Sequence, residues 1–270
     1  MKFGAYDILT PSPVTMSFIL GLILLCAGAS YTAADFQCTQ IPGKLKQIDA
    51  GAGQVYGVND DGNIFFFVNN IWQQVPGQLV HVSVGPAGVW GVNNAGVVFK
   101  LQNNQWQSVT GLLKQVDAGG NKFLVGVNSD NSIYCLKQSC VTSKSSLVSF
   151  SPVDGKLKYY SCGSAGCWGV NGDNNIFFRQ NVSPDACEGS QWQQVDGRLL
   201  MVEVSTDGFV YGVNEAGNAF RRDGISVNYP TGTVWTLLDF CATFKHITYD
   251  SGFLWLLSRA GDIYRCNNQN

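Results

Sequence analysis

Tyr56-Gly57-Val58-Asn59 is the first copy of a four-residue sequence that decides the fold, because it recurs along the chain. Its further copies are Trp90-Gly91-Val92-Asn93, Val125-Gly126-Val127-Asn128, Trp168-Gly169-Val170-Asn171, Tyr211-Gly212-Val213-Asn214 and the degenerate Trp255-Leu256-Leu257-Ser258. The last residues of successive copies are 34, 35, 43, 43 and 44 positions apart. A period of this size indicates tandem units that pack on one another.

Each copy predicts four short strands in a fixed order. One strand precedes the repeated sequence, the Gly-Val-Asn strand comes second, and a tight turn with Gly or Asn at its tip leads to the third. The fourth starts at a Trp in three copies, namely Trp72, Trp106 and Trp192. The segments are β-branched and aromatic without a 3.6-residue rhythm, which argues against a helical solenoid. The chain is therefore expected to be all-β, a six-bladed β-propeller.

The two ends of the chain complement each other. The last copy stops after its third strand, at residues 262–266. Residues 38–43 match the fourth-strand sequence 72–77, with Cys38 in the place of Trp72. We therefore expect the N-terminal strand to complete the last blade, and a Cys38–Cys266 disulfide to close the ring, which also protects the sheet edges.

The N-terminal region predicts secretion. Residues 18–27 are an apolar run too short to span a bilayer, and small residues follow it. We expect a signal peptide over residues 1–34, cleaved near 29–34, and one propeller domain over residues 35–270 in an extracellular protein. An N-terminal membrane anchor is the alternative, and Met16 is an alternative start to Met1.

Eight cysteines remain once Cys26 in the signal is set aside, an even number that suits an oxidising compartment. Besides Cys38–Cys266, the local pairs predict Cys135–Cys140 and Cys162–Cys167, and elimination leaves Cys187–Cys241. Zinc binding is the competing interpretation, but the C-x4-C spacing lacks the usual C-x2-C knuckle.

Composition excludes several functions. Only 13% of the 270 residues are charged and the formal net charge is −2, which argues against nucleic-acid binding. The two histidines, His81 and His246, fall at equivalent repeat positions, so a structural role is favoured over a catalytic one. We expect no enzyme activity, although paired carboxylates for glycoside cleavage remain a third option.

The recurring patterns L-x-x-(V/I)-(D/S)-x-G, (W/Y)-G-V-N and W-x-x-V-x-G resemble the tectonin repeat of secreted fish-egg lectins and horseshoe-crab tectonin lectins. The resemblance spans about residues 36–270, with departures at Leu256-Leu257-Ser258 and at the missing Trp of the third copy. It implies a propeller that binds N-acetylglucosamine-type sugars and bacterial surface glycans such as lipopolysaccharide, with a role in the egg or in innate defence. A propeller adaptor that binds protein partners is the alternative, and homo-oligomerisation is left open.

Polar side chains at the turns between the second and third strands should gather on one face of the propeller. Hydroxyl-binding groups of this kind suit a sugar site. The candidates are Asn59, Asp61, Asn93, Asn128, Asp130, Asn171, Asp173, Asn214 and Glu215. The alternative is that the asparagines only hold their own turns. The three Trp residues could likewise stack on a sugar or pack blades together.

One position of the first strand should line the central tunnel. It reads Asp49, Ser83, Asp117, Ser161, Glu203 and Thr248. If Asp49, Asp117 and Glu203 converge on the axis, they suit Ca²⁺, although no cofactor is required. The alternative is that each side chain caps a turn of its own blade. Asn181-Val182-Ser183 predicts N-glycosylation at Asn181, and Pro184 disfavours it.

Overall fold

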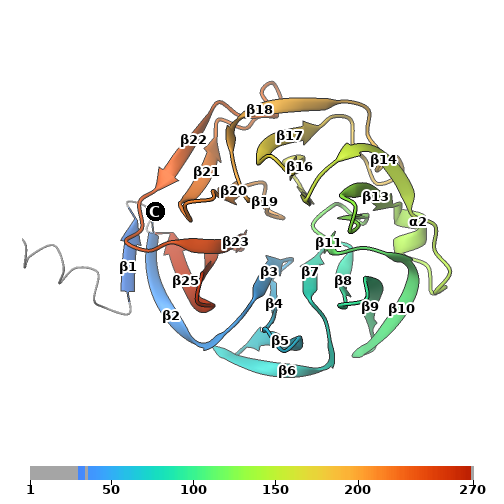
Figure 1. The fold of residues 1–270 in the computed structure, drawn as a ribbon, viewed down its shortest axis with the longest axis horizontal. Helices are drawn as coiled ribbons and strands as arrows, with labels where there is room; N and C mark the ends of the chain where they lie inside the picture. Colours follow the sequence, from blue (N-terminus) through green and yellow to red (C-terminus); the bar gives the residue numbers. More distant parts are fainter. Residues whose placement is uncertain (1–29, 34–35, 269–270) are drawn as a thin grey trace, which may run out of the picture.

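Six antiparallel sheets surround a central axis in the computed structural model, which describes residues 30–33 and 36–268 (Figure 1). The apolar run of the predicted signal peptide lies outside the described residues. Among the described residues, no helix has the length and apolarity needed to cross a membrane. The predicted six-bladed β-propeller is confirmed.

Each blade consists of four strands that follow one another from the axis outward. Blades one to three contain β3 (Gln47–Gly51), β4 (Gln54–Val58), β5 (Asn63–Val68) and β6 (Ile71–Gln78); β7 (His81–Gly85), β8 (Gly88–Val92), β9 (Val97–Gln102) and β10 (Gln105–Leu112); β11 (Gln115–Asp117), β12 (Leu124–Val127), β13 (Ser132–Leu136) and β14 (Ser151–Lys156). Blades four to six contain β15 (Tyr159–Gly163), β16 (Gly166–Val170), β17 (Asn175–Arg179) and β18 (Trp192–Arg198); β19 (Met201–Val204), β20 (Val210–Val213), β21 (Ala219–Asp223) and β22 (Val234–Leu238); β23 (Phe244–Asp250), β24 (Phe253–Ser258), β25 (Asp262–Asn268) and β2 (Phe36–Lys44).

Both chain ends build the sixth blade. Strand β2 pairs with β25 in the register Cys38↔Cys266 and Ile41↔Ile263, and the Cys38–Cys266 disulfide joins them. The predicted closure is therefore confirmed. A fifth strand, β1 (Ser30–Ala33), pairs with the outer edge of β2.

The W-x-x-V-x-G sequence packs neighbouring blades together. Gly77 adopts φ +120°, and a Cβ there would lie 2.9 Å from Cδ1 of Trp106 in the next blade. A side chain is excluded by both the backbone conformation and the contact. The same contact recurs between Gly43 and Trp72 and between Gly155 and Trp192. The tryptophans therefore pack blades, as the alternative interpretation had it.

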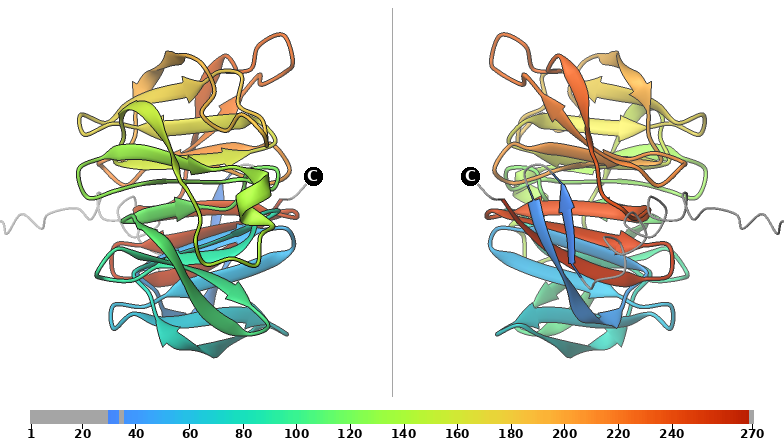
Figure 2. Two further views of the ribbon diagram at one scale, coloured as in Figure 1. Left: turned by 90° about the vertical axis from the view of Figure 1, so that its right-hand side faces the viewer. Right: turned by 90° about the vertical axis from the view of Figure 1, so that its left-hand side faces the viewer.

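The two faces of the disc differ in their connections. The short-turn face carries the turns between second and third strands and the links between blades. The long-loop face carries the other turns and loops, and Figure 2 shows helix α2 (Gln138–Val141) and the orange loop of blade five on the same side. The third-to-fourth-strand loops of this face span only residues 69–70 and 103–104 in blades one and two, but 137–150, 180–191 and 224–233 in blades three to five.

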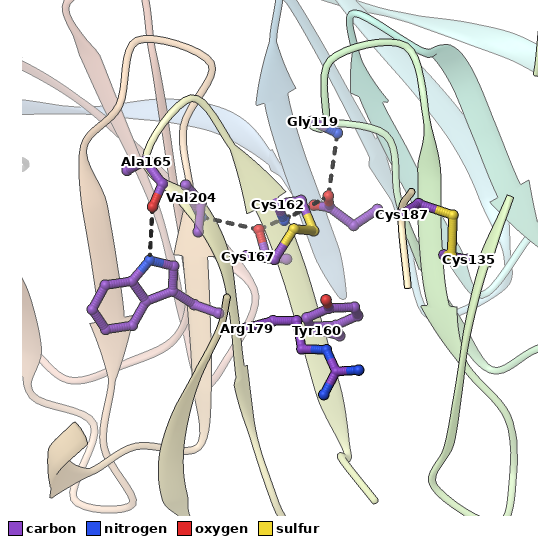
Figure 3. Close-up of a disulfide and its surroundings, with 12 residues drawn as sticks. Gly119, Cys135, Tyr160, Cys162, Ala165, Cys167, Arg179, Cys187 and Val204 are labelled. Carbon is purple, nitrogen blue, oxygen red and sulfur yellow. Dashed lines mark hydrogen bonds between the residues drawn. A yellow bond between two sulfur atoms is a disulfide. The ribbon is translucent and has the colours of Figure 1, made fainter. Parts of the chain in front are cut away.

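Two predicted disulfides are wrong. Cys135 pairs with Cys187, not with Cys140, and Cys140 and Cys241 are free, so the Cys187–Cys241 pair is also absent (Figure 3). The reason is the fold of the long loops. The helix that follows β13 carries Cys140 away toward blade two, where Lys100 Nζ donates to the Val141 carbonyl at 2.5 Å.

The loop of residues 180–191 instead folds back onto blade three. The ion pair Lys137–Glu188, at 2.8 Å, and the bond from Gln138 N–H to the Pro184 carbonyl, at 3.1 Å, hold it there. Cys187 thus reaches Cys135, with the two Cα atoms 5.9 Å apart. The third predicted bond, Cys162–Cys167, is present and spans the turn between β15 and β16.

Candidate functional site

The turn asparagines of the short-turn face are held by their own backbone. In blade two, Asn93 Oδ1 accepts hydrogen bonds from the N–H groups of Ala95 and Val97, both at 3.0 Å. In the other blades, too, the N–H four residues on donates to the turn side chain. The acceptor is Oδ1 of Asn59, Asn128, Asn171 or Asn214 at 2.8–2.9 Å, and Oγ of Ser258 at 3.0 Å. The carbonyl oxygen of each amide therefore serves its own turn first, which leaves the amide NH₂ group as the main group for a ligand.

Grooves between neighbouring blades are the concave sites of this face. The first groove, between blades one and two, has a volume of about 590 Å³. Its polar wall carries Lys46, Asp61 and Gln78, its apolar wall Val80 and Ala95, and Asn93 and Asn94 close it. Such a combination of few polar groups and an apolar wall suits a small polar ligand.

A second groove, between blades two and three, occupies the equivalent place with about 300 Å³. Val80 and Leu112 replace Lys46 and Gln78 of the first groove, and Lys114 and Ser129 supply polar groups. The two grooves therefore share a backbone but differ in side chains.

The predicted sugar residues are only partly brought together. Asp61 and Asn93 line the first groove, and Asn93 also lines the second. Neither groove includes the remaining candidates, Asn59, Asn128, Asp130, Asn171, Asp173, Asn214 and Glu215. Neither includes an aromatic side chain, because the blade tryptophans are used in packing.

Sequence reasoning missed Lys46 and Gln78. The signal was available in the repeat, since Lys46 follows and Gln78 precedes a Leu that recurs two residues before the inner strand in blades one to five. A Cβ at Gly91 would lie 2.4 Å from Cδ1 of Leu79, so this Leu packs against the glycine of the repeated sequence. Its neighbours must then point out toward the face.

The tunnel carboxylates hold neighbouring blades together. Asp49 Oδ2 accepts from Val84 N–H of blade two at 2.7 Å, and Asp117 Oδ1 accepts from Cys162 N–H of blade four at 2.9 Å. Glu203 accepts from the Ser161 and Tyr159 hydroxyls, at 2.9 and 3.0 Å. These bonds run to neighbouring blades rather than to each residue's own turn, which corrects the alternative interpretation.

This arrangement does not place the three carboxylates in one ligand set. Within the described residues, the group of His, Cys, Asp or Glu side chains whose ligand atoms all lie within 4.8 Å of one another is Cys135, Cys187 and Glu188. The two cysteines of that group form a disulfide, and the tunnel carboxylates are not part of it. Calcium binding by Asp49, Asp117 and Glu203 stays a prediction.

Burial dominates the electrostatics of the tunnel. It raises the pKa of Asp49 to about 6 and, together with the nearby Asp49 carboxylate, that of Asp117 to about 8. Burial also raises the pKa of Glu203 well above its usual value. A carboxyl group in this tunnel therefore keeps its proton to a higher pH than it would in water.

Both histidines are buried beside the tunnel. His246 Nε2 lies 2.7 Å from the Ile48 carbonyl, and burial lowers its pKa to about 4. His81 is 9% exposed and neither of its ring nitrogens has a hydrogen-bond partner. The Tyr159 ring lies between them, with its centroid 6.0 Å from that of His81 and 6.1 Å from that of His246.

The long-loop face has hollows of its own. One of about 530 Å³ lies over blades three to five and is lined by Asn121, Phe123, Ser164 and Thr206 among others. Asn181, the predicted glycosylation site, is exposed on the same face, and its Nδ2 donates to Ser190 Oγ at 2.8 Å. Glycosylation of Asn181 stays a prediction.

Comparisons with known proteins agree with the repeat. The family model described as Tectonin domain matches residues 44–259. A fish-egg lectin from Cyprinus carpio is 53% identical over 232 residues, which cover 85% of this chain and 98% of that protein. The 31 kDa subunit of perivitellin-2 from Pomacea maculata is 39% identical over 75 residues, 27% of this chain and 26% of that protein.

Solved structures show the same architecture at low identity. A gluconolactonase from Xanthomonas campestris superposes with a TM-score of 0.63 at 8% identity, covering 87% of this chain and 91% of that one. At this identity the likeness concerns the fold alone. Taken with the matched family model and the extensive identity to the carp lectin, the repeat places this chain in the tectonin family.

Proposed function

We propose that this protein is a secreted, non-enzymatic lectin that binds N-acetylglucosamine-type sugars in the grooves of the short-turn face. The observation that carries the proposal is the 53% identity to a fish-egg lectin over 98% of that protein. In the first groove, Asp61 and Lys46 can bond sugar hydroxyls, while Val80 and Ala95 can cover an apolar edge of the ring.

Several weak sites on one face would favour dense glycans over free sugars. Two neighbouring grooves on one rigid face allow one polysaccharide, or several chains of one surface, to engage both. The gain comes from effective concentration rather than from new contacts. A bacterial surface glycan such as lipopolysaccharide is the target that this geometry favours, in an egg or innate-defence role.

A glycan array followed by titration tests the proposal. We expect binding that free N-acetylglucosamine competes. Asp61→Ala should weaken it about tenfold, the value of one hydrogen bond to a charged group. Asp173→Ala is the matched control, because Asp173 is an exposed acid two residues after its turn Asn, like Asp61, but lines neither groove. Equal losses in both variants would contradict the assignment of the site.

An adaptor function is the second candidate, and one observation favours it. The loop of residues 224–233 exposes Val227 at 99% and Tyr229 at 65% on the long-loop face. Exposed apolar side chains of this kind mark protein interaction surfaces when they cluster. Silence across the glycan array would favour this candidate over the lectin.

A further inference from the structure

The residue just before each inner strand lies at the mouth of the tunnel on the short-turn face. In blades one to five the backbone is the same, because its N–H donates to the carbonyl of the Val that ends the second strand, at 2.7–2.8 Å. In blade six the equivalent residue is Lys245, which lies within β23 at the register irregularity between Phe244 and His246. The six residues around the mouth are Lys46, Val80, Lys114, Lys158, Leu200 and Lys245.

The four lysines form two pairs on opposite sides of the axis. Blades six and one are neighbours. Burial is the main cause that lowers the pKa of Lys245, and the charge of Lys46 lowers it further. Blades three and four are neighbours, and the Lys114 charge acts in the same way on Lys158. In a ring of six blades, one and four face each other, as do three and six (Figure 1). Val80 and Leu200 separate the pairs.

These ammonium groups keep donors free. In the described part of the chain, none of the ion pairs within 4.0 Å involves them. Lys114 Nζ donates to Asn131 Oδ1 at 2.5 Å, and Lys158 Nζ donates to Asn174 Oδ1. Each ammonium group has three N–H bonds, so at least two remain. Three acids lie nearby: Asp60 acts on Lys245, Glu215 acts on Lys158, and Asp61 lines the first groove with Lys46. The four lysines therefore outnumber the acids around them.

A second observation points to a ligand at the same place. His81 directly follows Val80 in the chain, is about nine-tenths buried, and has no partner for either ring nitrogen. The Tyr159 ring lies 6.0 Å from the His81 ring and 6.1 Å from that of His246, so the three rings pack together beneath the mouth-lining positions. A neutral imidazole carries one N–H donor, and a buried donor without a partner is costly unless something outside the protein accepts from it.

We propose that the tunnel mouth binds a polyphosphorylated sugar, with one phosphate at Lys46 and Lys245 and a second at Lys114 and Lys158. Lysine ammonium groups bind phosphate as compact charges. A phosphate oxygen or a ring hydroxyl accepts from His81. This site shares Lys46 and Lys114 with the neutral-sugar grooves, whereas Lys158, Lys245 and His81 line neither groove.

Titration calorimetry of the full chain with inositol hexakisphosphate, at low ionic strength and with EDTA, tests the site. We expect binding of one ligand per chain that weakens as NaCl is added, and none of myo-inositol. Lys46→Gln with Lys158→Gln removes one ammonium from each pair and should weaken binding at least about tenfold. Lys114→Gln with Lys245→Gln should do the same. His81→Phe should give a smaller loss.

The matched control removes the same charge from the other face. Lys122 and Lys144 are exposed on the long-loop face, so Lys122→Gln with Lys144→Gln should leave the affinity within about twofold, since distant charges are screened. An equal loss in the control, or no binding by the wild-type chain, overturns the proposal. Titration of the wild-type chain and of the Lys122→Gln with Lys144→Gln control with N-acetylglucosamine separates this failure from failure of the lectin proposal, because neither chain changes a groove residue.

Discussion

The two faces of this propeller are made by the same strands but vary in different ways. On the short-turn face, five turns carry the same Asn with the same bond to the residue four positions on. On the long-loop face, the third-to-fourth-strand loops range from residues 69–70 to residues 137–150. One face keeps its backbone and changes side chains, and the other changes its backbone.

The difference teaches where recognition can be tuned. A repeated backbone presents equivalent grooves, and the exchange of Lys46 and Gln78 for Val80 and Leu112 changes their chemistry without new loop structure. Long loops need their own supports, here a disulfide and the Lys137–Glu188 ion pair. The sugar affinity of the short-turn face should therefore stay the same when the supports of the long loops are removed.

The largest loss of stability expected from a substitution comes from removing the support of the long loops. Cys135→Ala with Cys187→Ala releases a cross-link over 52 residues and should lower the free energy of unfolding by about 4 kcal/mol. Urea unfolding measures the loss, and hydrogen exchange should speed up at residues 180–191. Sugar affinity at 20 °C should not change. Cys140→Ala, which breaks no disulfide, is the control; a large fall in sugar affinity in the double variant would break the comparison.

The buried carboxyl groups around the axis, between the two faces, should make stability depend on pH. Asp49 and Asp117 have folded-state pKa values of about 6 and 8, above the usual 3.8. The folded state therefore holds more protons, and stability should fall as pH rises from 4 to 8, by about 1.4 kcal/mol per pH unit for each retained proton. Unfolding in EDTA measures this slope.

Asp117→Asn should flatten that slope, because it removes the group with the higher of the two values. Adding Ca²⁺ to the wild-type chain provides the second arm. An unchanged melting temperature in Ca²⁺ would rule out the predicted calcium site. If the pH dependence of stability is the same in Asp117→Asn as in the wild-type chain, the Asp117 carboxyl is not its source.

A turn asparagine should matter for stability more than for ligand binding. Asn93→Ala leaves the N–H groups of Ala95 and Val97 without their acceptor and should cost about 1–2 kcal/mol. Asn94→Ala, at the exposed neighbouring position, should cost less than about 0.5 kcal/mol. Chemical denaturation compares the two. Equal costs would show that the turn bonds do not hold this face.

The smallest effect concerns two equivalent tryptophans. Trp192 Nε1 donates to the Asp154 carbonyl at 2.8 Å, whereas Trp106 Nε1 is buried without a partner. Both contact a glycine of the preceding blade, so replacement by Phe loses similar packing. Trp192→Phe should therefore cost about 1 kcal/mol more than Trp106→Phe. The reverse order in urea unfolding would contradict this account of the blade contact.

The fold could be predicted from the sequence because the repeat encodes contacts between adjacent units. The aromatic-Gly-Val-Asn strands, the Trp that meets a Gly, and the fourth-strand sequence at residues 38–43 each specify one local contact. Two disulfides could not be predicted, because Cys187 reaches Cys135 through a loop without a repeat-equivalent counterpart. Spacing along the chain carries no information on how such a loop folds back.

The candidate site could be predicted only in part, and for a physical reason. The sequence places Asp61 and Asn93 on the face that carries the grooves. An Asn that recurs in every full copy of the repeat, however, is there to hold the turn that each blade needs. Residues that distinguish one groove from the next, such as Lys46, stand beside the repeated positions rather than in them.

The most direct test of the central claim is a crystal structure of the chain soaked in N-acetylglucosamine. We predict sugar density in the groove between blades one and two, within hydrogen-bond distance of Asp61 and against Val80. Sugar bound only on the long-loop face, for instance over Phe123 and Ser164, would contradict the claim that the short-turn face carries recognition.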